Sequence, residues 1–241
     1  MNKKDEIIIF TDGASRGNPG PGGYGTIVVY PPLDEVVELG GGKPKTTNNE
    51  MELSAIVSAF AYIASNSSSV KVFTDSKYAI NGITKWVENW KKNDWMTQDK
   101  KPVSHKELWE TLSNLIADRT GVVEWIHLPG HSGVIGNEQA DKIATQFADG
   151  KNYELYRGNL AGYGIDILNI DIDQIKLKQK KDREKRATGK AYSYLSVVDG
   201  ELEKHETWAE CEARVKGKKA QFKKSLSPEH EAEILHEWGF E

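Results

Sequence analysis

The chain has 241 residues, of which 38% are hydrophobic and 28% are charged, and its formal net charge is −4. That length allows one large domain or two small ones, each with a real hydrophobic core. No apolar run approaches the roughly 20 residues of a membrane span, and the run near the N-terminus is too short for a signal peptide. A single cysteine, Cys211, excludes an internal disulfide framework, so we expect a cytoplasmic protein.

The first half of the chain alternates between apolar runs and polar turns. Runs at 6–10, 24–30 and 35–39 predict three strands of an antiparallel meander, with a glycine- and proline-rich loop between the first two. A helix then opens at Asn48 and Asn49, either of which would cap its N-terminus.

Strands and helices alternate in the part that follows. Runs at 70–76 and 122–128 predict two more strands, and we expect helices at 77–95, 104–119 and 138–148. Strands that are joined through helices lie parallel to one another. The order therefore predicts an α/β fold with a five-stranded mixed sheet covered by helices.

The C-terminal part of the chain has a different composition. We interpret residues 1–150 as one domain and residues 151–190, which lose clear periodicity, as a basic linker. Residues 191–241 then predict a small α+β module with a strand, a helix, a basic loop that could hold a second strand, and a capped terminal helix. Its segment 214–224 holds six Lys or Arg and no acid, which is typical of a region that binds an anion.

Four acids stand where strands end or helices begin: Asp12, Glu52, Asp75 and Asp141. In sheets of this kind functional residues collect near the carboxyl ends of strands. Converging carboxylates raise one another's pKa, and a pair of Mg²⁺ ions would relieve that repulsion. Taken singly, each acid also fits a turn, a helix terminus or a solvated helix face. The joint pattern favours a metal cluster.

Four segments of the sequence carry a resemblance to a known family: FTDGASRGNPGPGGYG, TTNNEMEL, FTDSKYAINGITKWVENWKKNDW and HSGVIGNEQADKIA. In order and spacing they closely resemble type 1 ribonuclease H. The resemblance implies the ribonuclease H-like fold and cleavage of the RNA strand of RNA–DNA hybrids by a two-metal mechanism, giving 5′-phosphate and 3′-hydroxyl products. It implies two Mg²⁺ ions, with Mn²⁺ as an alternative. The four acids would be the metal ligands, and His131 would match the family's mobile catalytic histidine.

The same resemblance implies which side chains contact the hybrid near the cut. Asn18, Asn48 and Asn49 would contact its strands, where RNA is recognised through the 2′-hydroxyl. Thr47 would help to hold a DNA phosphate.

A stretch that alternates tryptophan with lysine, residues 86–101, matches the family's basic protrusion. Rings and charges in alternation suit a sugar–phosphate surface, and Trp86, Lys91 and Lys92 would be its contacts. The alternative interpretation is that the tryptophans pack the helix against the sheet and that the lysines are solvated.

Residues 207–224 resemble the hybrid-binding domain that is often joined to these enzymes, although its usual place is N-terminal. The resemblance implies that this region contacts the hybrid through Trp208, Phe222, Lys223 and Lys224. The alternative is that the two rings belong to the core of a small unit and that the lysines are solvated.

Two other functions fit the same fold. One is a non-catalytic hybrid-binding protein, which would not need four converging acids. The other is a relative that acts on double-stranded RNA or in DNA strand transfer. We expect an RNA–DNA hybrid as the partner, no membrane association, and a monomer.

Overall fold

The computed structural model describes residues 6–129, 133–171, 173–175, 177, 180–181, 189–238 and 240. The chain divides into two compact units, Met1–Ile175 and Lys176–Glu241. No described helix is both long enough and apolar enough to span a membrane.

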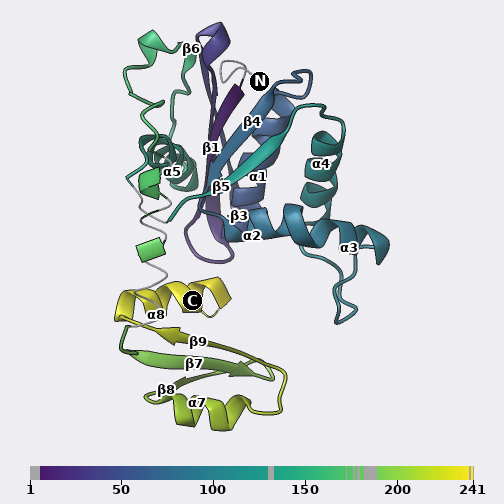
Figure 1. The fold of residues 1–241 in the computed structure, drawn as a ribbon, viewed down its shortest axis with the longest axis vertical. Helices are drawn as coiled ribbons and strands as arrows, with labels where there is room; N and C mark the ends of the chain where they lie inside the picture. Colours follow the sequence, from purple (N-terminus) through teal and green to yellow (C-terminus); the bar gives the residue numbers. More distant parts are fainter. Residues whose placement is uncertain are drawn as a thin grey trace. The chain divides into compact units, whose positions relative to one another are not determined.

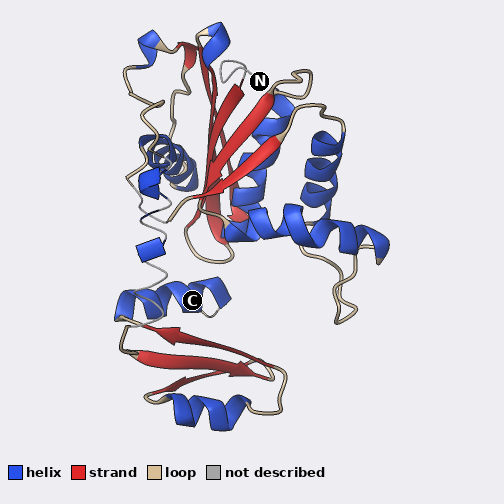
Figure 2. Ribbon diagram, viewed as in Figure 1, coloured by secondary structure: helices blue, strands red, loops and turns tan. Residues whose placement is uncertain are grey.

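Six strands form the sheet of the first unit: β1 (Glu6–Ser15), β2 (Gly20–Tyr30), β3 (Glu35–Thr46), β4 (Ser69–Thr74), β5 (Val123–His127) and β6 (Arg157–Asn159). Their order across the sheet is β5-β4-β1-β2-β3-β6. Figures 1 and 2 show β5, β4 and β1 side by side. β4 runs parallel to β1 and to β5, whereas β2 is antiparallel to β1 and β3. The predicted mixed α/β sheet is confirmed, and β6 adds a sixth strand beside β3 that the sequence did not reveal.

Helices cover both faces of this sheet: α1 (Asn48–Tyr62), α2 (Lys77–Asn81), α3 (Val87–Lys92), α4 (Lys106–Ala117) and α5 (Ile135–Ala148), with short turns η1 (Pro31–Leu33), η2 (Gly82–Trp86) and η3 (Ala161–Tyr163). Figure 1 shows α1 and α4 on one face and α5 on the other. Each face of the sheet has its own hydrophobic core, and the side chains of β1 point alternately into one core and the other. Ile7 and Ile9 pack in the cluster on the α1 side, and Phe10 packs in the cluster on the α5 side.

Several boundaries differ from the sequence prediction. Asp12 lies inside β1 rather than after it, because the glycine-rich stretch that we expected to be a loop pairs with β2 as far as Ser15 and Gly22. The N-cap of α1 is Thr47, whose hydroxyl accepts a hydrogen bond from the backbone N–H of Glu50, so neither Asn48 nor Asn49 is the cap. The helix expected at 77–95 is divided among α2, η2 and α3 and ends at Lys92.

The segment after α5 belongs to the first unit, so most of the expected linker 151–190 is not a linker. Tyr163, Ile167 and Ile175 are buried in the core on the α5 side. The regular elements described in residues 150–171 are β6 and η3, of three residues each, so the segment has no long periodic pattern that could reveal these residues.

Buried Glu38 on β3 explains how this segment is held. Its carboxylate accepts hydrogen bonds from the hydroxyl of Tyr163 at 2.6 Å, the backbone N–H of Tyr156 at 3.0 Å and the amide of Gln139 at 2.8 Å. A buried carboxylate needs such donors, so the segment completes the fold of the first unit.

The second unit is a three-stranded antiparallel sheet in the order β8-β7-β9 with two helices. Its elements are β7 (Ser193–Val198), β8 (Glu201–His205), α7 (Trp208–Val215), β9 (Ala220–Ser225) and α8 (Pro228–Trp238). Figure 1 shows α7 and α8 on opposite faces of this sheet. The expected α+β module is present, with one strand more than predicted, because β8 is rich in charge and its side chains are largely exposed.

Candidate active site

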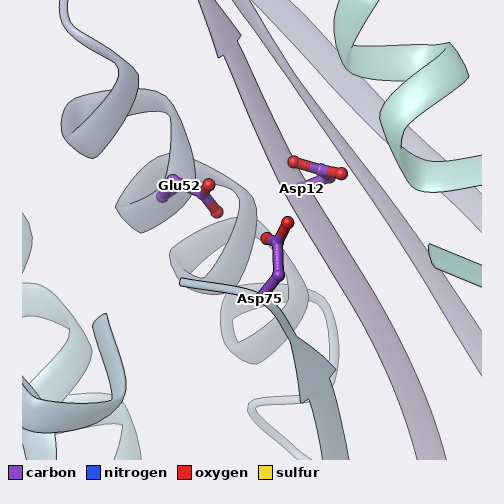
Figure 3. Close-up of side chains that lie close together, drawn as sticks. All are labelled: Asp12, Glu52 and Asp75. Atoms are coloured by element: carbon purple, nitrogen blue, oxygen red, sulfur yellow. The ribbon is translucent and has the colours of Figure 1, made fainter. Parts of the chain in front are cut away.

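Three carboxylates from separate elements converge at the carboxyl ends of β1 and β4. Asp12 projects from β1 and Glu52 from the first turns of α1, and Asp75 is the residue that directly follows β4. One carboxylate oxygen from each lies within 4.8 Å of the others. Figure 3 shows the three side chains pointing toward one another.

Two glycines allow the helices to approach so closely. A Cβ on Gly13, the neighbour of Asp12, would lie 2.3 Å from the backbone nitrogen of Glu52. A Cβ on Gly25, which pairs with Asp12 across the sheet, would lie 2.1 Å from the backbone oxygen of Ala140. A larger residue at position 13 would therefore push α1 away from β1, and one at position 25 would push α5 away from β2.

Burial and mutual repulsion act on this cluster together. Asp12 is 7% exposed and Glu52 is 5% exposed. Burial raises the pKa of Asp12 well above its usual value, and the charges of Asp75 and Asp141 raise it further. Burial likewise raises the pKa of Glu52, with Asp12 as the next largest cause. Without a cation the cluster therefore holds its protons to a higher pH than isolated carboxyl groups do.

Asp141 lines the same cavity as the other three acids, although it is exposed and lies at the rim. The cavity has a volume of about 150 Å³. Its lining residues are Asp12, Gly13, Asn48, Glu52, Asp75, Asn137, Glu138 and Asp141. The four acids of the sequence prediction thus share one pocket.

Asn137 is a lining residue that sequence reasoning missed. It is 6% exposed, and its side-chain oxygen has no hydrogen-bond partner among the described residues. It precedes Asp141 by four residues, so the two lie on one face of α5. That spacing in GNEQAD was the signal that could have revealed it.

The other predicted contacts of the first unit surround this site to different extents. Asn48 lines the cavity, and Thr47 caps α1. Asn18 is half-buried in the turn between β1 and β2, whereas Asn49 is exposed. His131 lies outside the described residues.

Tryptophan rings pack in a row on the predicted protrusion. The rings of Trp86 and Trp90 lie 5.6 Å apart, and Trp90 lies 5.7 Å from buried Trp109. Trp86 is 36% exposed, and Lys91 and Lys92 are exposed beyond it. The row thus runs from the core to the surface: Trp109 packs inside the unit, and Trp86 is exposed at the outer end.

The second unit has an aromatic row of its own. Trp208, at the start of α7, lies 5.7 Å from the ring of Tyr194 and 5.5 Å from that of Phe222. Trp208 is 41% exposed and Phe222 is 50% exposed. The rings are therefore not core residues of this unit. Lys224 donates a hydrogen bond to the backbone oxygen of Gly189 and is half-buried, as is Lys223.

The sequence model of the RNase H family matches residues 4–149 of this chain. The chain belongs to the ribonuclease H family. Ribonuclease HI of Pseudomonas aeruginosa is 44% identical over 146 residues, which cover 61% of this chain and 95% of that protein. Ribonuclease H of Alcanivorax borkumensis is 46% identical over 143 residues, covering 59% and 91% respectively. The second unit lies outside the segment that the family model matches.

Solved structures give the same fold. LC9-RNase H1, described as a type 1 RNase H with the type 2 active-site motif, superposes with a TM-score of 0.55 and 23% identity, over 70% of this chain and 84% of its own. That likeness confirms a ribonuclease H-like fold. Membership of the family together with the acidic cluster indicates an enzyme that uses a divalent metal.

Proposed function

We propose that this ribonuclease H hydrolyses the RNA strand of RNA–DNA hybrids at the cavity of Asp12, Glu52, Asp75 and Asp141, with two Mg²⁺ ions and with 5′-phosphate and 3′-hydroxyl products. The observation that carries the proposal is the convergence of three carboxylates within 4.8 Å in a chain of this family. A protein that only bound hybrids would have no need to bury like charges together.

The side chains of the cavity fit a hard divalent cation. All the side-chain donors are oxygens or amides, and Mg²⁺ and Mn²⁺ both prefer oxygen ligands. Glu52 has a buried carboxylate oxygen with no hydrogen-bond partner among the described residues. Such an oxygen is costly unless a ligand binds it. Asp12, Glu52 and Asp75 would hold the ions, with Asp141 at the rim.

When bound, a pair of such cations stabilises the attacking and the leaving oxygens of an in-line phosphoryl displacement. The protein contributes the ionised form of the carboxylates. Because burial and repulsion raise the pKa of Asp12 and Glu52, protons compete with the cations for these oxygens. Activity is therefore expected to fall as the pH is lowered.

Polar groups beside the cavity would distinguish RNA from DNA. Asn48 lines the cavity at the N-terminal end of α1, where the helix dipole and free N–H groups favour an anionic phosphate. Asn18 and Asn49 would contact the strands nearby, and Thr47 a DNA phosphate. His131 would assist proton transfer or product release.

Two surfaces outside the cavity would hold the duplex. On the first unit, exposed Trp86 with Lys91 and Lys92 would contact the sugar–phosphate backbone. On the second unit, Trp208 and Phe222 would lie against the hybrid, with Lys223 and Lys224 along the backbones. Support comes from the exposure of the two rings, since large apolar side chains that a small unit leaves outside its core are typical of binding surfaces.

The test compares RNA–DNA, RNA–RNA and DNA–DNA duplexes of one sequence, with and without Mg²⁺. We expect metal-dependent cleavage of the RNA strand of the hybrid alone, and loss of cleavage in Asp75→Asn. Cleavage of RNA–RNA at a comparable rate would replace the proposed substrate. Undiminished cleavage by Asp75→Asn would overturn the proposed site.

A further inference from the structure

The turn between β1 and β2 carries an arginine, Arg16, close to the active site. It is not one of the proposed metal ligands or substrate contacts. Arg16 directly follows Ser15, the last residue of β1, and lies four residues beyond Asp12 on the same chain segment. Its backbone N–H donates a hydrogen bond to the oxygen of Pro21 at 2.7 Å, which closes the turn. Its side chain is 48% exposed and therefore accessible to a ligand.

A carboxylate after α5 fixes the direction of this side chain. The Nε of Arg16 donates to Oδ1 of Asp149 at 2.6 Å, and the ammonium of Lys151 lies 3.2 Å from the other oxygen of Asp149. The hydrogen bond from Arg16 is the first cause of a lowered pKa of Asp149, so Asp149 stays ionised. Two cations and one anion leave this trio with one positive charge.

The remaining donors of Arg16 point to a ligand. Neither Nη of its guanidinium makes a hydrogen bond to another residue in the described part of the chain. A guanidinium presents donors in a planar fork that matches two oxygens of a phosphate. With Nε held by Asp149, the fork is oriented in advance, so little side-chain entropy is lost when an anion binds.

We propose that Arg16 binds a non-scissile phosphate of the hybrid backbone and thereby positions the substrate in the cavity. Four residues of extended chain separate it from Asp12, or about 13 Å at 3.3 Å per residue. One strand of a duplex rises about 3.4 Å per nucleotide, so the phosphate lies within a few nucleotides of the cut. The assignment rests on the proposed function, and it makes Arg16 a substrate-positioning residue.

Hybrid binding measures this contact directly. In chains that carry Asp75→Asn to keep the hybrid intact, Arg16→Ala is expected to weaken binding about tenfold. The slope of log affinity against log salt should become less steep by about 0.7–0.9, which is the effect of one phosphate contact. Arg16→Lys keeps the charge without the fork and should recover part of the affinity.

Arg157 provides the matched control. It is an exposed arginine on β6 whose guanidinium donates to the hydroxyl of Tyr62 at 2.8 Å, and it lies at the opposite end of the sheet from the cavity. Arg157→Ala removes the same charge and is expected to change hybrid affinity by less than about twofold, because it makes no phosphate contact. An equal loss in the two variants would mean that only net charge matters and would overturn the proposal.

A set of hybrids with a single uncharged methylphosphonate locates the phosphate. In the Arg16-containing chain, one position within a few nucleotides of the cut should weaken binding about tenfold. In Arg16→Ala the same substitution should have no effect, because the contact is already lost. If every methylphosphonate weakens hybrid binding equally with and without Arg16, the proposal is wrong. The arginine then only stabilises the end of α5 through Asp149. If the parent chain with Asp75 neither binds nor cuts a hybrid, the proposed function fails instead.

Discussion

The two units of this chain place their functional side chains in opposite ways. The first unit buries acids that repel one another, and the second leaves large aromatic rings in solvent. Neither arrangement favours folding, because buried like charges and exposed apolar rings both cost free energy. Such departures from good packing are typical of sites that act on a ligand. The contrast supports the proposed division of roles, in which chemistry lies in the first unit and duplex recognition is shared with the second.

The largest effect is expected in the acidic cluster. Asp12→Asn removes one charged metal ligand, and the cations contribute several kcal/mol of transition-state stabilisation, so hybrid cleavage should fall about a thousandfold or more. Hybrid binding by the second unit should remain. Single-turnover cleavage and fluorescence anisotropy separate the two. A variant that lost both to the same degree would contradict the division of roles between the units.

The same variant is expected to be more stable than the parent without metal. Because the folded-state pKa values of Asp12 and Glu52 are raised, the native state binds more protons than the unfolded state. Their contribution to stability is present below about pH 4, the ordinary range of these acids, and is lost as the pH rises through the raised values. Thermal unfolding in EDTA at pH 5 and pH 8 measures this. The advantage of Asp12→Asn should grow with pH and shrink when Mg²⁺ is added.

The next effect concerns the boundary between the units. A fragment of residues 1–150 leaves buried Glu38 without the hydroxyl of Tyr163 and the N–H of Tyr156. Each lost hydrogen bond to a charged group costs about 1.5–3 kcal/mol, so this fragment should be less stable by about 3 kcal/mol or more. A fragment of residues 1–175 keeps both donors and should retain cleavage. Urea unfolding of the two fragments decides where the catalytic unit ends, and equal stability would restore the boundary at 150.

Much of the first unit could be predicted from its sequence, because the signals there are local. The FTD pattern before Asp12 and before Asp75, together with the apolar runs, placed both acids near strand ends of one sheet. Glu52 and Asp141 followed from their family motifs. All four then line one cavity, as expected.

What could not be predicted depends on contacts between distant parts of the chain. Tyr163 donates a hydrogen bond to Glu38, which lies 125 residues earlier in the sequence, and no local pattern marks either residue as a partner. Gly13 looked like a loop residue and Gly25 like an ordinary strand residue, although their role is to let α1 approach β1 and α5 approach β2. Asn137 was missed because an asparagine four residues before an acid in a helix is a weak signal until its burial is known.

A smaller effect tests the aromatic row of the second unit. Stacking of a ring on a nucleotide contributes about 1–3 kcal/mol, so Trp208→Ala and Phe222→Ala should each weaken hybrid binding about tenfold. Single-turnover cleavage at saturating enzyme should not change. Tyr192→Ala is the control, since Tyr192 is 48% exposed, packs against Lys204 and is not part of the row. If all three variants bind equally, the row does not contact the duplex.

The smallest expected effect concerns a difference in backbone conformation between the two units. In the first, Asp94, Trp95, Lys100 and His105 all have positive φ near the protrusion, whereas in the second Asp199 alone of the described non-glycine residues does, in a tight hairpin turn where that conformation is favoured.

Lys100, with φ of 58°, is the clearest case because its side chain is exposed and a left-handed conformation is unfavourable for lysine. Lys100→Gly relieves that strain and should stabilise the protein by about 1 kcal/mol. Lys101→Gly is the control, since Lys101 does not have a positive φ and the added chain entropy of glycine should destabilise the fold. Chemical denaturation of both variants compares them. A Lys100→Gly variant no more stable than Lys101→Gly would mean that the loop relaxes without cost and that the protrusion stores no strain.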